Sequence, residues 1–380
     1  MMISRIGMVL LTTIGVGVLA APAQAASTGV VSVSKTTQVK YTAGSGKANK
    51  VVITRSGRTV TIDDKVKIKA GKGCKTVKGD KTKVRCKLTK NPTRVHVQAG
   101  SKNDTVVNKT GIRVTLEGGS GNDILVGGSN LDRLFGGSGA DKLYGGDNND
   151  VLYGGTGNDK LYGQDGGGDY LYGDENDDAL YGGEGDDKIF GGAGNDKLYG
   201  ERHYDKLEGG AGNDYVNGGA GSDILWGDVK NAPAVIGADV ILGGPDNDTV
   251  NYDRPQATAD LDGVKGDDGA PGEGDTLGTD VENLAGNGAG DYTFTGNNAD
   301  NLLWGAAGDD VIHGGGGDDD IRGNAGANKL YGNAGDDKIH GSDYYQDAAD
   351  TVDGGANSEL IGDLCWVSKL DVATACERLP

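Results

Sequence analysis

Aspartate recurs at a nearly constant interval of nine residues through the stretch 118–226, and carboxylates at such regular spacing can bind divalent cations. The stretch contains twelve copies of one nine-residue unit with a single extra residue, and GGSGNDILV (118–126) and GGTGNDKLY (154–162) are clear copies. Position 1 is always glycine and position 8 is always aliphatic. Position 6 is aspartate in all twelve copies: Asp123, Asp132, Asp141, Asp150, Asp159, Asp169, Asp178, Asp187, Asp196, Asp205, Asp214 and Asp223.

The charge of this stretch favours a bound hard cation. The stretch holds 21 Asp/Glu against 7 Lys/Arg, a formal −14, and carboxylates stacked at sheet spacing repel one another. The available ligands are oxygen atoms, from carboxylates and from the carbonyls of glycine turns. They suit Ca²⁺, which accepts irregular geometry, better than Mg²⁺, which requires an octahedron. Because the stretch has no Cys and only one His, His203, a zinc or copper site lacks ligands.

The unit also predicts the element that positions these aspartates. Glycines at positions 1, 2 and 4 favour a six-residue turn, because glycine adopts conformations that a Cβ forbids, and positions 7–9 predict a short strand. Two units then form one coil of a flattened solenoid, and each unit stacks on the unit two further along at about 4.8 Å. Position 8 faces a continuous core, and positions 7 and 9 face solvent. The alternative is a disordered acidic linker, which has no need of a periodic aliphatic residue; we expect disorder without calcium.

Position 9 is often aromatic, and the aromatic residues fall on opposite faces of the predicted solenoid. One face carries Tyr144, Tyr162, Tyr181 and Tyr199, and the other carries Phe135, Tyr153, Tyr172, Phe190 and Trp226. We interpret both rows as in-register packing along a sheet. The alternative is a platform on which carbohydrate rings stack.

The unit G-G-x-G-x-D-x-aliphatic-x resembles the haemolysin-type, or repeats-in-toxin (RTX), calcium-binding nonapeptide. The resemblance is strong over 118–251 and 296–340 and weak over 99–117. It implies an all-β, right-handed parallel β-roll, a kind of β-solenoid, with multiple calcium ions between successive turns. In the family, aspartate side chains and the carbonyls of the glycine turns hold the ions. The ligands that the resemblance implies here are the twelve aspartates above together with Asp248, Asp310, Asp319 and Asp337.

Three units depart from the family pattern. GERHYDKLE (200–208) lacks the second and fourth glycines, and GGSNLDRLF (127–135) has Asn130 at position 4. GNAGANKLY (323–331) has Asn328 in place of the aspartate. These turns are candidates for half-sites or empty sites.

Residues 1–25 are typical of a secretory signal peptide. Arg5 precedes an apolar run, Ile6–Ala20, and Ala23-Gln24-Ala25 forms a cleavage site of the small-x-small type. The alternative is a membrane anchor, but the run is short for a bilayer span. No later stretch is apolar enough to cross a membrane. We therefore expect a secreted protein, extracellular or associated with the cell surface.

Residues 26–98 predict a basic, β-rich N-terminal domain that caps the open end of the roll. The segment 26–117 contains 21 Lys/Arg and 5 Asp/Glu, a formal +16, whereas residues 118–380 carry −36. The basic charge has two interpretations: solubility with attraction to the acidic half of the chain, or adhesion to anionic cell-envelope polymers. Nucleic-acid binding is not expected, because Tyr41 is the only aromatic residue available to stack on a base.

The four cysteines form two local pairs, Cys74/Cys86 and Cys365/Cys376. An even count, an export signal and short loops predict one disulfide in the N-terminal domain and one in a C-terminal cap.

The remaining domain boundaries follow from where the nine-residue units occur along the chain. A first calcium-binding array spans 99–251, a loop insert that continues the roll spans 252–295, a second array spans 296–340, and the C-terminal cap spans 341–380. The insert resembles a segment that recurs among relatives, and Asp262, Asp275 and Glu282 are candidates for one more calcium site.

The sequence favours a calcium-binding protein that folds on binding extracellular Ca²⁺ over an enzyme. It contains no G-x-S-x-G elbow, H-E-x-x-H helix or Cys/His pairing, and no repeat-free region of catalytic-domain size. The alternative function is a calcium-dependent surface adhesin or matrix component that binds anionic envelope polymers through the basic N-terminal domain.

Overall fold

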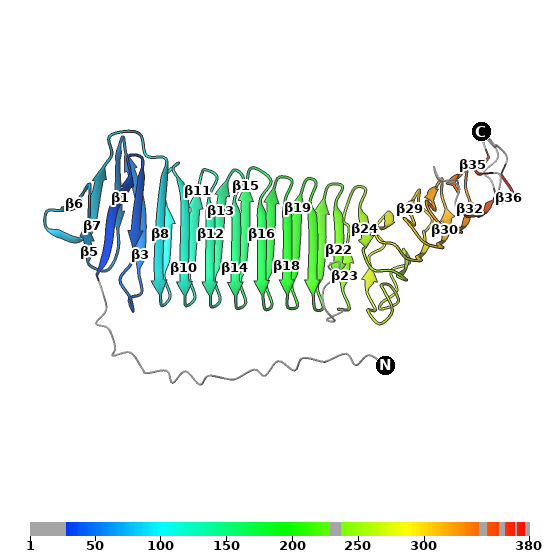
Figure 1. Cartoon of the computed structure of the whole chain (residues 1–380), viewed down its shortest axis with the longest axis horizontal. Coiled ribbons are helices and arrows are strands. Elements are labelled where there is room, and N and C mark those ends of the chain that lie inside the picture. Colours follow the sequence, from blue (N-terminus) through cyan, green and yellow to red (C-terminus); the bar gives the residue numbers. More distant parts are fainter. Residues whose placement is uncertain (1–27, 229–236, 342–347, 357–361, 369–370, 377–380) are drawn as a thin grey trace, which may run out of the picture.

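The computed structural model describes residues 28–228, 237–341, 348–356, 362–368 and 371–376. These residues form 36 β-strands and no helix, arranged as one elongated stack of parallel coils (Figure 1). The predicted all-β parallel roll is therefore confirmed. The described residues hold no helix that could cross a bilayer. The expected signal peptide, 1–25, lies outside the described residues.

One sheet, here called sheet A, runs the length of the molecule and pairs strands from both arrays. It has 17 strands, and all its pairings are parallel except that of β1 with β2. In spatial order from the N-terminal end they are β5 (Ile68–Ala70), β1 (Gly29–Lys35), β2 (Gln38–Thr42), β8 (Arg94–Ser101), β10 (Arg113–Ser120), β12 (Arg133–Ser138), β14 (Val151–Thr156), β16 (Tyr170–Glu175), β18 (Lys188–Ala193), β20 (Lys206–Ala211), β22 (Ile224–Asp228), β24 (Thr249–Tyr252), β27 (Asn283–Gly286), β29 (Leu302–Trp304), β31 (Asp320–Arg322), β33 (Lys338–His340) and β35 (Leu364–Trp366).

The opposite face of the roll is divided between two sheets, B and C, with 13 and 6 strands. Sheet B comprises β6 (Cys74–Val77), β7 (Asp80–Lys87), β4 (Thr59–Asp63), β3 (Lys50–Ser56), β9 (Thr105–Asn108), β11 (Ile124–Gly128), β13 (Lys142–Asp147), β15 (Lys160–Asp165), β17 (Ala179–Glu184), β19 (Lys197–Arg202), β21 (Tyr215–Ala220), β23 (Val240–Leu242) and β26 (Thr276–Leu277). Sheet C comprises β25 (Thr258–Asp260), β28 (Thr293–Thr295), β30 (Val311–Gly316), β32 (Lys329–Ala334), β34 (Thr351–Ala356) and β36 (Val372–Thr374).

The insert is where sheet B ends and sheet C begins. Strand β26 is the last of sheet B, and β25, which precedes it in the chain, is the first of sheet C. Sheet A bridges the change through the pairs β24–β27 and β27–β29. The two arrays therefore share one sheet, and the roll changes direction at the insert (Figure 1).

Most strands of the first array are longer than the pattern predicts. A typical strand such as β13 has six residues, Lys142–Asp147, and includes positions 7–9 of one unit and 1–3 of the next. The expectation of three-residue strands and six-residue turns was therefore wrong. Glycine makes the longer strand possible, because Gly146 at position 2 has a φ of +117° and bends the strand toward the turn.

The core consists of two rows of aliphatic side chains, one from each face of the roll. Every position-8 residue from Leu125 to Leu225 has no exposed surface, and each lies in register with the one two units away, as Leu143 does with Leu161. The predicted inward direction of position 8 is confirmed. A coil buries this residue only by stacking on its neighbours, which is the general property of solenoids.

The N-terminal region continues the two faces instead of forming a separate body. Strand β8 pairs with β2 on one side and with β10 on the other, and β9 pairs with β3 and β11. Antiparallel pairs β3–β4, β4–β7 and β6–β7 complete sheet B at this end. Its two outermost strands, β6 and β7, are joined by the Cys74–Cys86 disulfide. The second predicted disulfide, Cys365–Cys376, is also present.

Candidate metal centres

The position-6 aspartates lie in the turns, directly before the strands, and form rows along the edges of the roll. Row A precedes the strands of sheet A: Asp132, Asp150, Asp169, Asp187, Asp205, Asp223, Asp248, Glu282, Asn301, Asp319, Asp337 and Asp363. Row B precedes the strands of sheet B: Asp104, Asp123, Asp141, Asp159, Asp178, Asp196, Asp214, Asp239 and Asp275. Row C precedes those of sheet C: Asp310, Asn328, Asp350 and Asp371.

A repeated hydrogen bond fixes each carboxylate within its row. The backbone N–H of Asp123 donates to Oδ1 of Asp141 at 2.6 Å, and that of Asp141 donates to Oδ1 of Asp159 at 2.7 Å. Row A repeats the pattern, for example from Asp132 to Asp150 at 2.6 Å. One oxygen of each side chain is thereby used to connect one coil to the next.

The second carboxylate oxygen has no such partner. In all sixteen predicted aspartates, and in Asp104 and Asp239, Oδ2 is buried and accepts no hydrogen bond. The sixteen residues themselves are at most 3 % exposed. Burying an ionised oxygen without a partner is costly, so each of these atoms marks a place for a cation or a proton.

In most units the glycine at position 1 lies close to both a carbonyl oxygen and the unpartnered carboxylate oxygen. A methyl group added to Gly209 would lie 2.6 Å from Oδ2 of Asp214 and 2.6 Å from the carbonyl oxygen of Gly227, one coil further on. At Gly154 the corresponding distances are 2.5 Å to Asp159 and 2.7 Å to Gly173. Carboxylate and carbonyl oxygens thus converge from two consecutive coils. Oxygen ligands of these two kinds are those that Ca²⁺ uses in proteins.

The electrostatics of the rows also fit a cation. Desolvation by burial raises the pKa of all sixteen predicted aspartates, to values between about 6 and about 9, although the backbone hydrogen bond lowers the pKa of each. The largest rises are at Asp205 and Asp214, both to about 9, where neighbouring row members add like charge. A divalent ion would offset the effect of burial, since its charge stabilises the ionised form and lowers the pKa.

All three departing units keep the hydrogen bond of the rows, but only two keep the unpartnered oxygen. Asp132 and Asp205 retain a buried, unpartnered Oδ2, and Glu201 and His203 adopt the positive φ of the missing glycines, +78° and +80°. At Asn328 the side-chain oxygen accepts the N–H of Asp310 at 3.0 Å. Its amide nitrogen donates to the carbonyl oxygens of Asn324 and Gly326 at 3.2 and 3.3 Å.

The side-chain amide of asparagine therefore takes the place of both the carboxylate and the cation that the carboxylate would bind. The N–H₂ group of Asn328 satisfies carbonyl oxygens of its own turn. Asn301 in row A similarly donates to the carbonyl oxygen of Glu282 at 2.9 Å. Before the first aspartate of row B, the side chain of Asn49 donates to the carbonyl oxygens of Lys47 and Ala99 at 3.1 and 3.0 Å. The turns of Asn328 and Asn301 therefore need no metal to satisfy their side-chain amides, whereas the buried Oδ1 of Asn49 accepts no hydrogen bond.

The structure adds row members that the predicted set does not include. Asp104 and Asp239 have the unpartnered Oδ2 of the predicted residues, and burial raises their pKa to about 7 and about 6. Asp275 accepts the N–H of Asp239 at 3.0 Å, and Asp363 accepts that of Asp337 at 2.9 Å. Three of them show a shorter signal that could have found them: an aspartate two residues before a buried aliphatic, as in Asp239-Val240-Ile241.

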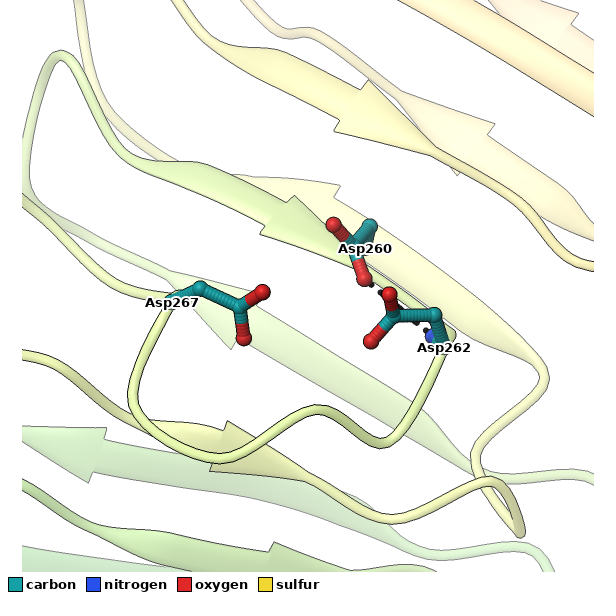
Figure 2. A group of neighbouring side chains, drawn as sticks. All are labelled: Asp260, Asp262 and Asp267. Atoms are coloured by element: carbon teal, nitrogen blue, oxygen red, sulfur yellow. Dashed lines mark hydrogen bonds between the residues drawn. The ribbon is translucent and has the colours of Figure 1, made fainter.

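The extra site suggested for the insert is not formed. Asp275 lies in row B and Glu282 in row A, where Glu282 Oε2 accepts the N–H of Asp248 at 2.9 Å. Asp262 instead lies beside Asp260 and Asp267 on a surface loop (Figure 2). These three carboxylates have oxygens within 4.8 Å of one another, but Asp262 and Asp267 are exposed. The sequence could not predict this separation, because the insert lacks the nine-residue period that assigns each carboxylate to one edge of the roll.

A partly buried arginine, with a side chain 22 % exposed, lies beside the end of row B. Arg254 Nη1 is 3.1 Å from Glu273 Oε1, and Nη2 is 4.0 Å from Asp228 Oδ1. The side chains of Glu273 and Asp228 are only 2 % and 9 % exposed. Burial raises the pKa of Asp239 and Arg254 lowers it. The chain thus supplies a cation of its own where the regular units stop.

The outward aromatic residues stack on one another, as in-register packing predicts. Tyr144, Tyr162, Tyr181 and Tyr199 have ring centroids 4.9–5.0 Å apart and nearly parallel planes. The row on sheet A has the same geometry from Phe135 to Phe190. The two neighbouring rings cover both faces of each inner ring, so an inner ring presents only an edge to solvent and offers no face on which a sugar could stack.

The comparisons with known proteins bear on these rows. A search of curated proteins finds no match to the sequence. The model of the RTX calcium-binding nonapeptide repeat matches about half of the chain, over residues 115–143, 126–161, 144–175, 165–198, 172–207, 199–229, 236–254, 287–321, 295–329 and 313–343. These ranges contain all the aspartates that the sequence pattern singled out. The repeat, its parallel roll and its extent together show that the chain belongs to the RTX calcium-binding nonapeptide repeat family.

Proposed function

We propose that this chain is a secreted calcium-binding protein whose repeats fold into the roll when they bind extracellular Ca²⁺. The observation that carries the proposal is the buried, unpartnered oxygen that recurs in sixteen predicted aspartates. In the proposal those aspartates and the glycine carbonyls opposite them are the ligands. Bound calcium supplies the positive charge that lets the carboxylates stay ionised and buried. Its binding free energy then becomes folding free energy.

The expected affinity lies in the range of extracellular calcium, about 10⁻⁴–10⁻³ M. A typical turn offers several carbonyl oxygens but only one buried carboxylate, the one at position 6, and low ligand charge weakens a calcium site. A roll of this kind remains unfolded where free calcium is scarce and folds where it is plentiful. This behaviour suits a protein that must be exported before it folds.

Circular dichroism of the purified chain tests the proposal. Calcium added to a chelated sample should produce the β-sheet signal and raise Tm, whereas magnesium at equal ionic strength should not. A spectrum and a Tm that are the same in calcium and in chelator would contradict it. Calorimetric titration of the same sample gives the number of ions, which the proposal expects to be multiple.

Secretion is supported by the features of residues 1–25 and by the two disulfides, which persist in oxidising compartments. The mature chain should begin at Ala26, after the Ala23-Gln24-Ala25 site. Sequencing the N-terminus of the protein from the culture medium tests this directly. The proposal assigns calcium binding and no catalysis, so hydrolase screens of the mature chain should give no activity above a buffer control.

A second candidate function is adhesion to anionic cell-envelope polymers through the basic N-terminal domain. It is favoured by the division of charge, +16 over 26–117 against −36 over 118–380. The full chain should be retained on isolated cell walls in calcium and released by an excess of soluble polyanion. Retention that salt and polyanion leave unchanged would argue against an electrostatic adhesin.

A further inference from the structure

The segment 65–90 concentrates positive charge at the N-terminal end of the molecule. It contains eleven Lys/Arg and one acidic residue, Asp80, and therefore carries a formal +10. It includes strands β5, β6 and β7, which lie farthest from the C-terminal cap (Figure 1). We call this segment the basic tip. A charge of this density in 26 residues exceeds what solubility requires of a small domain.

The basic tip has a groove whose lysines lack acidic partners. A cavity of about 460 Å³ is lined in part by Lys67, Lys69, Lys78 and Lys81. All four side chains are exposed, and none makes an ion pair within the described part of the chain. The one carboxylate in the lining, Asp80, is 3.4 Å from the amine of Lys83.

The strands beside the groove also place like charges together. Lys75 of β6 is directly opposite Arg85 of β7, an arrangement that destabilises a sheet. The disulfide between the neighbouring residues Cys74 and Cys86 holds these strands in register against that repulsion. The surface is thus pre-organised and cationic before any partner arrives, which lowers the cost of binding an anion.

We propose that the basic tip is a docking surface for a linear anionic polysaccharide, and that the calcium-free repeats compete for it. A groove lined by separate amines recognises a chain of charges without recognising a sequence. Base stacking is not available, because Tyr41, the only aromatic residue in 26–117, has no exposed surface. This inference rests on the proposed calcium-dependent folding.

The competition arises because residues 118–380 are themselves a polyanion tethered to the basic tip. They carry −36, and a tethered ligand acts at an effective concentration in the millimolar range. In the folded roll the row carboxylates are buried and turned inward, so they no longer reach the basic tip. Ten divalent ions would also cancel the net −20 of residues 26–380. Calcium therefore releases the docking surface while it folds the roll.

Heparin, a linear sulfated polysaccharide, is the probe for the full-length chain. Wild type should bind immobilised heparin in calcium and lose most of its retention in EGTA at the same ionic strength. The variant Lys67→Gln/Lys69→Gln/Lys78→Gln/Lys81→Gln should bind more weakly in calcium. Its log–log salt slope should fall by roughly 3, since each contact with a flexible polyanion contributes about 0.7.

The matched control changes four exposed lysines of the roll, Lys142, Lys160, Lys197 and Lys329, to Gln. It should keep the wild-type slope. Equal losses in the two variants would overturn the assignment of the surface, and equal retention of wild type in calcium and EGTA would overturn the competition. Circular dichroism of the same samples separates the two proposals. Calcium-dependent folding without retention on heparin would contradict only this inference. A chain that does not respond to calcium would contradict the proposed function.

Discussion

One atom at position 6 decides whether a turn needs a metal. Aspartate and asparagine both offer Oδ1 to the preceding coil, as Asp178 and Asn328 do. They differ in the second atom, which is an unpartnered acceptor in Asp178 and a donor to two carbonyls in Asn328. The sequence placed these residues in the correct turns, but only the hydrogen bonds show that Asn328 completes its turn by itself.

Asp178→Asn should remove one calcium site and leave the coil intact. The amide keeps the acceptor for the N–H of Asp159, now at 2.6 Å, and replaces the unpartnered Oδ2 with a donor. The calcium stoichiometry should fall by one in a calorimetric titration. At calcium concentrations near 100 times Kd, stability should fall by about 2.7 kcal/mol, the contribution of one saturated site. An unchanged stoichiometry would show that this carboxylate is no ligand.

Asn328→Asp should have the opposite effects. The new carboxylate would complete row C with an acceptor in place of the amide that serves Asn324 and Gly326. Calorimetry should count one more calcium ion than in wild type. At calcium concentrations too low to fill the new site, the variant should be less stable than wild type, because a buried charge replaces a satisfied amide. A variant with wild-type stoichiometry would mean that the turn lacks other ligands.

At the scale of the strand and turn, the repeat predicts the stacking but not the lengths. The alternation of positions 7–9 correctly placed Leu161 inside and Tyr162 outside. It could not show that the strand continues through Gly163 to Asp165, because glycine is a weak strand former in isolation. Pairing with the coils on either side provides the hydrogen bonds that extend the strand, and that is a tertiary effect.

Gly209→Ala should weaken calcium binding at the adjacent candidate metal centre, because the added methyl group would occupy part of that site. The new methyl group would lie 2.6 Å from both Asp214 Oδ2 and the carbonyl oxygen of Gly227. We expect a loss of about 1–3 kcal/mol, the usual cost of overpacking, and the loss of one calcium ion. Thermal unfolding in calcium and calorimetry measure the two effects.

Gly111→Ala is the control for that substitution. Its methyl group would meet nothing closer than Ser129 Oγ, at 3.6 Å, and the residue needs no positive φ. Stability and stoichiometry should both stay at wild-type values. A similar loss in both variants would contradict the occupied centre as its cause, because stiffening the chain at a glycine of ordinary φ stabilises a fold.

At the scale of the whole molecule, the nine-residue period predicted a roll but did not predict how the insert is arranged within it. Residues 252–295 have no repeating aliphatic position, so the sequence could not assign Asp275 to row B or Glu282 to row A. The union of both arrays in sheet A was equally hidden, since it depends on β27 pairing with β24 and β29. The predicted domain boundaries stay a prediction, although β8 (Arg94–Ser101) crosses the one at 98/99.

Acid should partly replace calcium in stabilising the roll. Burial raises the pKa of the row aspartates to between about 6 and about 9, whereas an unfolded aspartate has a pKa near 3.9. The metal-free folded state therefore binds more protons than the unfolded state. The stability that these protonated carboxyls contribute to the metal-free roll is fully present below about pH 4. It is lost as the pH rises through their pKa values in the folded state.

Thermal melts in EGTA from about pH 5 to about pH 8 should show a Tm that falls with rising pH. Calcium binding near neutral pH should release protons, because each ion requires an ionised carboxylate. Titrations in two buffers of different ionisation enthalpy count those protons. A Tm in EGTA that rises with pH would contradict the assignment of buried, protonated carboxyls.

The spacing of eighteen residues between hydrogen-bonded row members, as from Asp123 to Asp141, has a consequence for how such a molecule can change length. Every coil recognises only the coil before it and the coil after it. Deleting a complete pair of units would bring two equivalent surfaces together and leave every other contact as it was. A gene for this protein can therefore gain or lose 54-base segments while its product remains a shorter or longer version of the same rod.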